Sequence, residues 1–284
     1  MVNSMLPLSR ILAGSKNSLT IKMFALSVVC LSLLGSAAMA ESEFPGRDVY
    51  PEVHYISLED LHAKRNQVVI VDVRSAYEFQ TLRIDNAKNI SLADANFSAQ
   101  MAALRKQDAR PIVVYCNGKT CMKSYKAVMT CMNDGIKDVV AFDAGIMDWA
   151  QRYPNETLLL DVKLSDPRKL ISKAHFKRHT LSPDAFGEHL ANSDDIVLDV
   201  RDRFQREGLS LFVGREYRVY LDDTKRLDRL LDKAKRERKG LLIYDASGHQ
   251  VQWLQYYLES KGLSNYYFMD GGIHAYYQQI ERKK

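Results

Sequence analysis

The chain has 284 residues, enough for about two domains; 46% of its residues are hydrophobic and 26% are charged. This composition excludes a collagen-like, low-complexity or largely disordered chain. The formal net charge is +5, but three basic residues and no acidic residue lie in the first 40 residues. The rest of the chain carries 37 basic and 35 acidic side chains, a balance that argues against nucleic-acid binding.

The first 40 residues have the layout of a secretory signal peptide. Basic residues come first, residues 23–40 are uncharged, and residues 23–35 are mostly apolar. Ala38 and Ala40 form a small-x-small site, so we expect cleavage after Ala40. An uncleaved anchor is the alternative, although the apolar run is shorter than the ~20 residues of a membrane-spanning helix. We therefore expect a periplasmic protein with no stable membrane insertion after signal cleavage.

The remainder of the chain contains an internal repeat of three apolar stretches. They lie at residues 68–74, 111–115 and 142–146 in the first half, and at 195–201, 240–244 and 269–273 in the second. The first stretch ends in Asp-Val-Arg in both halves, which predicts a buried strand that runs into a polar loop. The offset between the halves is 127 residues for the first and third stretches and 129 for the second. The two halves are therefore predicted to share one fold.

Helical patterns alternate with these strands, at residues 58–65, 125–134, 183–191 and 251–262. Alternation of this kind predicts an α/β fold in which each domain is a mostly parallel sheet with helices on both faces. A further mixed-charge amphipathic helix at 226–239 is interpreted as a solvated face, with a partner-binding face as the alternative. We assign residues 1–40 to the signal peptide, 41–155 to the first domain, 156–178 to a linker and 179–284 to the second domain.

The loop at residues 116–124 follows the strand that ends at Tyr115 and leads into a helix. In such sheets ligands bind at the carboxyl ends of strands. A cysteine there meets unpaired backbone N–H groups and the positive end of the helix dipole, and Lys119 and Lys123 add charge; all three effects favour a thiolate. The same amides would hold an anion such as thiosulfate, sulfite or phosphate. The candidate substrate-binding residues are Asn117, Gly118, Lys119, Thr120, Met122, Lys123 and Ser124.

Three cysteines, Cys116, Cys121 and Cys131, remain after the signal peptide. They do not make a disulfide scaffold, and an odd number leaves at least one thiol unpaired or only transiently paired. Cys131 lies on a predicted helix and is interpreted as a buried apolar cysteine. Cys116 and Cys121 are the candidate catalytic residues, because a thiolate in this loop is a nucleophile toward sulfur.

The chain resembles a tandem rhodanese, a sulfurtransferase. The resemblance rests on D-V-R-S-A-Y-E-F at 72–79, A-K-N-I at 87–90, the cysteine loop after V-V-Y, and A-G-I-M-D-W at 144–149, with D-V-R-D-R-F and D-G-G-I-H-A-Y in the second half. It implies that sulfane sulfur is carried as a cysteine persulfide, without a cofactor. It also implies that Asp72, Arg74 and Glu78 brace the active loop.

Two departures from the family pattern refine this expectation. The usual loop reads Cys-x-x-Gly-x-Arg-Ser, but the second half has Asp245 at the cysteine position and Gln250 at the arginine position. A carboxylate cannot carry a persulfide, so we expect the second domain to be inactive and to shape the substrate cleft. The first loop is two residues longer and resembles a two-cysteine subgroup. Position along the strand favours Cys116 as the carrier, whereas proximity to the helix favours Cys121.

The leading interpretation is an exported sulfurtransferase that moves sulfane sulfur from thiosulfate, a mercaptoacid or a persulfide donor. The partner is then a small sulfur-containing substrate or an acceptor protein thiol. Lys123 is the nearest residue to the missing family arginine, and it lacks the bidentate fork that suits thiosulfate. The alternatives are a thiol–disulfide redox protein, a non-catalytic binding module and, last, phosphatase or arsenate chemistry. The seven histidines, among them His54, His62, His175 and His179, suggest no metal site.

Overall fold

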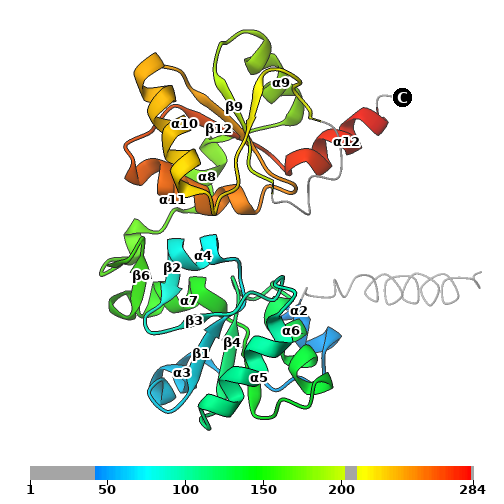
Figure 1. The fold of residues 1–284 in the computed structure, drawn as a ribbon, viewed down its shortest axis with the longest axis vertical. Helices are drawn as coiled ribbons and strands as arrows, with labels where there is room; N and C mark the ends of the chain where they lie inside the picture. The colour runs from blue at the N-terminus through cyan, green and yellow to red at the C-terminus, as the bar shows by residue number, and fades with distance from the viewer. Residues whose placement is uncertain (1–41, 202–209, 283–284) are drawn as a thin grey trace, which may run out of the picture. The chain divides into compact units, whose positions relative to one another are not determined.

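The computed structural model describes residues 42–201 and 210–282 (Figure 1). The signal peptide expected at residues 1–40 lies outside these ranges. Both repeated halves belong to one compact unit, Glu43–Lys284. Among the described residues, no helix combines the length and the apolar character needed to cross a membrane.

The first half is built on a parallel sheet of four strands. Their order is β3 (Lys88–Asn89), β1 (Val69–Asp72), β4 (Ile112–Tyr115) and β5 (Val139–Phe142). Asp72 pairs with Tyr115, and Tyr115 with Phe142, so the carboxyl ends of the three longer strands meet at one edge. Polar loops that leave this edge therefore lie side by side.

Helices cover both faces of this sheet, as the alternation of strands and helices predicted. They are α3 (Leu58–Lys64), α4 (Ala76–Thr81) and α7 (Gly145–Arg152) on one face, and α5 (Phe97–Gln107) and α6 (Lys123–Asn133) on the other. Successive strand residues point to opposite faces. Ile70 therefore packs in the cluster that contains Trp149 of α7, whereas Val71 packs with Met101 of α5. Because both faces of this sheet are buried, its strands are continuous runs of apolar residues in the sequence.

The second half repeats this strand order. Its parallel sheet runs β10 (Glu216–Arg218), β9 (Ile196–Asp199), β11 (Leu241–Tyr244), β12 (Tyr266–Met269) and β8 (Thr180–Leu181). Its helices are α8 (Lys173–Arg178), α9 (Pro183–Ala191), α10 (Thr224–Glu237), α11 (Gln250–Ser260) and α12 (Gly272–Arg282). In the first half, a single parallel bridge from Tyr55 to Ala141 takes the place of β8. A short helix, α2 (Pro45–Val49), precedes that bridge.

Residues 156–178, expected to be a linker, carry secondary structure: residues 157–169 belong to the first half, and residues 173–178 form α8 of the second half. β6 (Thr157–Leu159) and β7 (Val162–Lys163) form an antiparallel sheet with β2 (Leu82–Ile84). The 3-10 turns η1 (Pro154–Glu156) and η2 (Pro167–Lys169) flank these two strands. Strands of two or three residues are too short to show a hydrophobic period. The prolines and charged residues around them are typical of a loop. Only the stretch after η2 leads into the second half.

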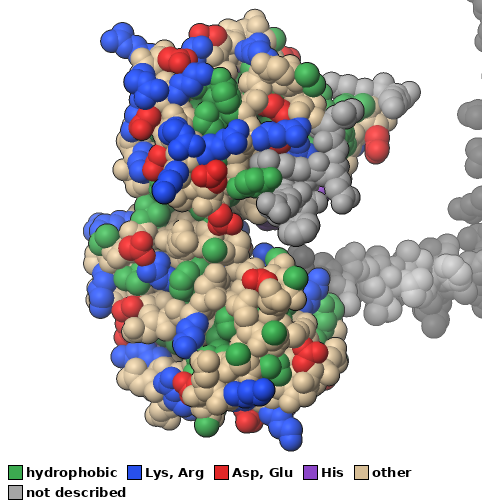
Figure 2. All heavy atoms as spheres, viewed as in Figure 1, with side chains coloured by type: hydrophobic (Ala, Val, Ile, Leu, Met, Phe, Trp, Pro, Cys, Tyr) green, Lys and Arg blue, Asp and Glu red, His purple; other side chains and the backbone are tan. Residues whose placement is uncertain are grey.

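The predicted helices are found with small shifts of their ends. α9 has the bounds that the sequence suggested, whereas α6 begins two residues early, α11 one residue early, and the helix expected at 226–239 covers Thr224–Glu237. Caps explain two of these starts, because the side chains of Ser182 and Asp223 accept hydrogen bonds from the first turns of α9 and α10. Figure 2 shows basic and acidic side chains interspersed over the visible face, consistent with the balanced charge.

Candidate active site

The cysteine loop lies at the carboxyl end of β4, where the repeat predicted it. Cys116 directly follows β4, and Met122 is the N-cap residue of α6. Gly145, the first residue of α7, packs against the loop backbone: a Cβ atom there would lie 2.5 Å from the Gly118 nitrogen and 2.7 Å from the Cys116 oxygen. Its φ of 68° also favours glycine. The start of α7 thus holds the loop in place.

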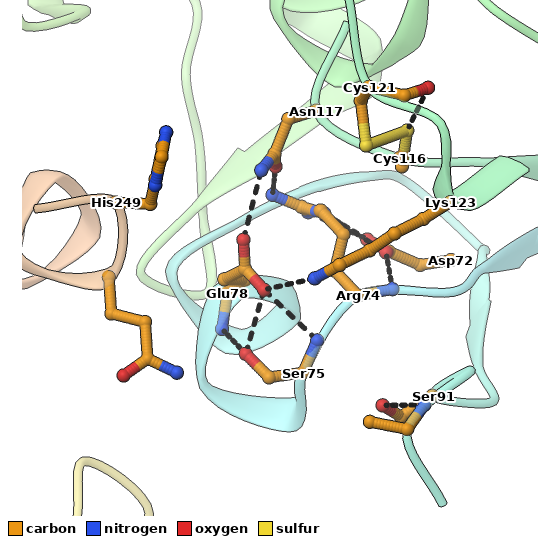
Figure 3. A network of polar contacts seen from close by, with 12 residues as sticks. Asp72, Arg74, Ser75, Glu78, Ser91, Cys116, Asn117, Cys121, Lys123 and His249 are labelled. Atoms are coloured by element: carbon orange, nitrogen blue, oxygen red, sulfur yellow. Dashed lines mark hydrogen bonds and ion pairs between the residues drawn. A yellow bond between two sulfur atoms is a disulfide. The ribbon is translucent and has the colours of Figure 1, made fainter. Parts of the chain in front are cut away.

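Cys116 and Cys121 form a disulfide within this loop (Figure 3). Cys116 is fully buried, whereas Cys121 is partly exposed and lines a cleft. The Ser124 hydroxyl lies 3.8 Å from Cys116 Sγ. Cys131 is a free, buried thiol, as expected, and burial raises its pKa to about 12. Of the three cysteines, Cys121 is the one that a ligand in the cleft would meet.

Asp72 and Arg74 form a buried ion pair below the loop. Arg74 donates from Nε to Asp72 Oδ1 (3.0 Å) and from Nη2 to Asp72 Oδ2 (2.6 Å). Its Nη1 donates to Asn117 Oδ1 at 3.1 Å, which ties the guanidinium to the loop. Burial opposes the charge of Arg74, yet Asp72 outweighs it and the pKa of Arg74 is raised. Since the Arg74 side chain is fully buried, it positions the loop and does not reach the cleft.

Glu78 completes this support from α4. Figure 3 shows Asn117, Lys123 and Ser75 converging on its carboxylate. Asn117 Nδ2 donates to Oε1 at 3.1 Å, Lys123 Nζ lies 3.9 Å from Oε2, and Ser75 forms a capping box with Glu78. Burial favours the neutral form of Glu78, but the nearby charges of Lys123 and Arg74 outweigh it and hold the pKa of Glu78 below its usual 4.5. The network therefore contains a charged carboxylate at neutral pH.

The remaining loop residues fall into two groups: some line the cleft, and the others are buried or lie at the start of α6. Asn117, Thr120 and Lys123 line the cleft with Cys121. Ser124 is buried, and Met122 occupies the N-cap position of α6 without a side-chain cap hydrogen bond. A Cβ atom at Gly118 would lie 3.5 Å from the backbone oxygen of Ala144, which is an ordinary van der Waals contact. The loop thus presents a small set of its predicted substrate-binding residues to the cleft.

Lys119 departs from the expectation that it promotes the thiolate. Its Nζ lies 2.5 Å from Glu43 Oε1 and 3.1 Å from Asp148 Oδ2, and the hydrogen bond to Glu43 raises the pKa of Lys119. Two carboxylates therefore offset its charge. Neither partner is near Lys119 in sequence, so the local pattern of the loop could not reveal them. The backbone amides at the start of α6 remain the main source of positive potential.

The cleft beside Cys121 has a volume of about 940 Å3. Its apolar lining includes Met147, Phe176, Trp253 and Tyr256, and its basic lining includes Lys123, Lys173, Lys177 and His249. Lys123 was predicted to bind substrate, but most of these residues come from α8 and α11 in the second half, and the loop pattern did not predict them. The available signal was the repeat itself, because α11 follows the second loop as α6 follows the first. A smaller cavity of about 430 Å3 lies beside Val69 and Arg110, at the opposite edge of the sheet.

In the second half, Asp245 occupies the position that Cys116 has in the first. Its buried carboxylate accepts backbone N–H bonds from its own loop and from the start of α11: Ser247 (3.0 Å), Gly248, Gln250 (2.7 Å) and Val251 (3.3 Å). Such an arrangement of amides is an anion site. The second loop therefore holds an anion supplied by the chain itself.

Comparison with known proteins agrees with the geometry of the first half. Residues 57–152 match the model of the rhodanese-like domain. The thiosulfate sulfurtransferase GlpE of Pseudomonas savastanoi pv. phaseolicola is 32% identical over 108 residues, which are 38% of this chain and 96% of that protein. The tRNA uridine(34) hydroxylase of Chlamydia pneumoniae is 26% identical over 114 residues, 37% of this chain and 34% of that protein.

Among solved structures, the crystal structure of a thiosulfate sulfurtransferase from Pseudomonas aeruginosa matches 80% of this chain and 42% of its own, with 19% identity and a TM-score of 0.37. The chain spans about a third of the length of the hydroxylases that it matches. The chain belongs to the rhodanese-like family, and its membership rests on the first half. Sulfurtransferase-type chemistry is thereby supported at the level of the family.

Proposed function

We propose that this protein is an exported sulfurtransferase that carries sulfane sulfur as a persulfide on Cys121. The observation that carries the proposal is the position of Cys121, partly exposed in a cleft and adjacent to the N-terminus of α6. The helix amides stabilise a thiolate and then the terminal sulfur of a persulfide. Similarity to a thiosulfate sulfurtransferase over 96% of that protein's length supports the same chemistry. Export rests on the signal-like sequence of the first 40 residues.

The first chemical step begins from the reduced loop. The Cys121 thiolate attacks the outer sulfur of thiosulfate, the bond between the two sulfur atoms of the donor breaks, and sulfite leaves with the electron pair. Cys121 then holds a persulfide. An acceptor thiolate attacks its terminal sulfur, takes it as a new persulfide and releases the Cys121 thiolate. A mercaptoacid or a persulfide donor would load Cys121 at the same atom.

Cys116 is proposed as the resolving thiol. The Cys116 thiolate attacks the inner sulfur of the Cys121 persulfide, forms the disulfide and releases hydrosulfide. An external dithiol then reduces the disulfide, is itself oxidised, and restores both thiols. The buried position of Cys116 suits this role, because an intramolecular partner reaches it while a substrate in the cleft does not.

The lining of the cleft supports an anionic substrate with some apolar surface. Lys123, Lys173 and Lys177 outnumber the two carboxylates of the lining and carry no bidentate fork. Those carboxylates, Glu78 and Asp270, lie 3.9 Å from Lys123 and 3.6 Å from Lys177. Trp253 and Tyr256 supply aromatic surface. A volume of about 940 Å3 far exceeds that of thiosulfate. A mercaptoacid, or a thiol presented on a small molecule or a protein segment, fits this lining better. The second half is proposed to shape the cleft and to carry no sulfur.

The experiment that tests the proposal is the intact mass of the reduced protein after exposure to thiosulfate or 3-mercaptopyruvate, with and without cyanide. The wild type, Cys116→Ser and Cys121→Ser are compared. We expect Cys116→Ser to gain one sulfur atom that cyanide removes and to retain it. The wild type should gain the same atom and lose it as Cys116 forms the disulfide, and Cys121→Ser should gain none. Sulfur retained by Cys121→Ser and lost from Cys116→Ser would reverse the two roles. No gain by any of these proteins would overturn sulfur transfer.

A thiol–disulfide redox function is the second candidate, and the disulfide between Cys116 and Cys121 favours it. In that case the pair cycles between dithiol and disulfide and no sulfur atom is carried. Either serine variant would then abolish activity, and mild oxidant would remove two hydrogens from the wild type only. The mass experiment separates the two functions, since only sulfur transfer adds mass after thiosulfate.

A further inference from the structure

Two histidines and a glutamate that are far apart in the sequence meet beside α8. They are His175 in α8, His179 at its C-cap, and Glu259 near the end of α11. One ligand atom from each lies within 4.8 Å of the other two. From this geometry we propose that His175, His179 and Glu259 form a binding site for a divalent transition-metal ion such as Zn2+.

The ring of His179 is already oriented as a metal ligand would be. Its Nδ1 lies 3.0 Å from the backbone oxygen of Tyr266. A carbonyl oxygen only accepts, so Nδ1 carries the proton and the neutral ring has its lone pair on Nε2. The ring also stacks on the Tyr266 ring, with centroids 4.2 Å apart. Histidines that bind metals commonly donate their other nitrogen to a carbonyl or carboxylate in this way.

The carboxylate of Glu259 is held by neighbours as well. The Tyr266 hydroxyl donates to Oε1 at 2.8 Å, and Gln255 Nε2 donates to the same oxygen at 3.0 Å. His175 Nε2 lies 3.0 Å from Oε1, so this imidazole nitrogen faces the carboxylate and carries a proton in the metal-free protein. Metal binding replaces this hydrogen bond and releases the proton to solvent. Among the residues that the structure describes, His175 is the charged group paired with this carboxylate, and the outer hydrogen bonds hold it in place for a cation.

The ligand set selects the class of metal. Two imidazole nitrogens and one carboxylate oxygen suit Zn2+ and its neighbours in the transition series, whereas Ca2+ and Mg2+ require mostly oxygen ligands. Tetrahedral ligands around Zn2+ lie about 3.3 Å apart, so side-chain rotations close the present spacing. The His175 and Glu259 side chains are each 34% exposed, so water can reach the remaining position.

The site has a structural consequence for the cleft. α8 contributes His175 to the proposed site, while Phe176 and Lys177 of the same helix line the cleft. A metal held between α8 and α11 would therefore fix one wall of the cleft. The metal proposal itself stands on the three ligands and does not depend on the sulfur chemistry of the first half.

The test titrates Zn2+ into the metal-free full chain, with its loop disulfide intact, and follows binding by calorimetry. His175→Gln, His179→Gln and Glu259→Gln are compared with His54→Gln, which changes an exposed histidine outside the cluster. We expect one site per chain, a loss of affinity of about tenfold or more in each cluster variant, and wild-type affinity in His54→Gln. Thermal unfolding in the presence of a chelator checks that each variant folds, and if His179→Gln does not fold, the comparison rests on His175→Gln.

A second readout uses Co2+ in place of Zn2+, because its absorption spectrum distinguishes nitrogen and oxygen ligands from thiolate. A spectrum without thiolate bands, lost in His175→Gln, would support the assignment. Absence of a stoichiometric site would overturn it. So would a site whose affinity is unchanged in His175→Gln and His179→Gln, or one with thiolate bands, since the metal would then lie elsewhere.

Discussion

The loops after β4 and β11 occupy the same place in sheets with the same strand order, but a different group lies at the centre of each. Asp72 pairs in register with Tyr115 in the first sheet, as Asp199 pairs with Tyr244 in the second. In the first loop the residue after the strand is a cysteine in a disulfide; in the second it is Asp245, bonded to backbone amides. The second loop therefore holds its own carboxylate among backbone amides, and in the proposed function the substrate anion takes the corresponding place in the first loop.

The supports under the two loops also differ. Arg74 and Arg201 each make a buried ion pair with the aspartate two residues before them. In the first half, Arg74 also donates a hydrogen bond to Asn117, and the Asn117 amide donates one to Glu78. Ala246 stands at the position of Asn117 in the second half, and its methyl group makes no such bonds. The longer, cysteine-containing loop is thus held by side chains, whereas the shorter loop is held by its own carboxylate.

The largest contrast is expected from alanine at the two glycines that pack on these loops. A Cβ atom at Gly145 would lie 2.5 Å from the Gly118 nitrogen, and one at Gly272 would lie 2.5 Å from the Asp245 oxygen. Both positions have positive φ, so Gly145→Ala and Gly272→Ala should each destabilise the protein by about 2–4 kcal/mol. Only Gly145→Ala should also lower the rate of persulfide formation, by about tenfold or more.

Denaturant unfolding and the rate of sulfur uptake from thiosulfate check this contrast. Gly272→Ala is the matched control, because it introduces the same strain beside the loop that carries no sulfur. Equal loss of activity in both variants, measured where both are folded, would contradict the assignment of sulfur chemistry to the first loop alone.

The next largest effect is expected at Asp245. Asp245→Ala leaves buried amides in the second loop without their acceptor, at a cost of about 2–3 kcal/mol in the free energy of unfolding. Asp245→Asn keeps one acceptor oxygen and should cost less. Persulfide formation at Cys121 should persist in both variants under folding conditions. Unfolding curves in urea provide the measurement, and wild-type stability in Asp245→Ala would show that the carboxylate does not stabilise this loop.

A pH dependence is expected from Glu78. Because its pKa is lowered in the folded protein, the stability that it contributes is fully present above its usual 4.5 and is lost as the pH falls through its folded value. Glu78→Gln removes this contribution. The difference in unfolding free energy between wild type and Glu78→Gln should therefore be largest near neutral pH and shrink below 4.5. A difference that grows on acidification would have the wrong sign for this account.

The smallest effect is expected from Lys123, which lines the cleft with half of its side chain exposed. Lys123→Ala should raise KM for thiosulfate about threefold and leave kcat nearly unchanged, because an exposed charge contributes little in water. Lys126→Ala, an exposed lysine on the same helix, is the control and should change neither constant. Identical KM values for the two variants would remove Lys123 from substrate binding.

Much of the fold and the position of the site could be predicted from local sequence patterns. Apolar runs that end in Asp-Val-Arg indicated β1 and β9, and the strand–loop–helix order placed Cys116 at the carboxyl edge of the sheet. β6 and β7 were missed because two or three residues cannot show a period. Local pattern also could not show which cysteine is buried, because burial depends on the loop path between β4 and α6.

Contacts between side chains that are distant in sequence and partly exposed likewise could not be predicted from the sequence. Glu43 and Asp148 meet Lys119 only in the folded chain, so the loop seemed more basic than it is. The scattered histidines predicted no metal site. His175 and His179 are nevertheless four residues apart, and the third member of the proposed site, Glu259, lies in a different helix. That spacing was the available signal, and it became informative only with the neighbouring helix in place.

The most direct test of the account is to locate the sulfur atom within the first loop. Trypsin cuts after Lys119 and Lys123, so Cys116 and Cys121 fall in separate peptides, and Cys131 falls in a third. The reduced protein is loaded with thiosulfate, alkylated at short times to trap the persulfide before the second loop cysteine resolves it, and digested before mass spectrometry. The account predicts a cyanide-sensitive extra sulfur on the Cys121 peptide. Sulfur found on the Cys116 peptide alone, or on neither, would contradict it.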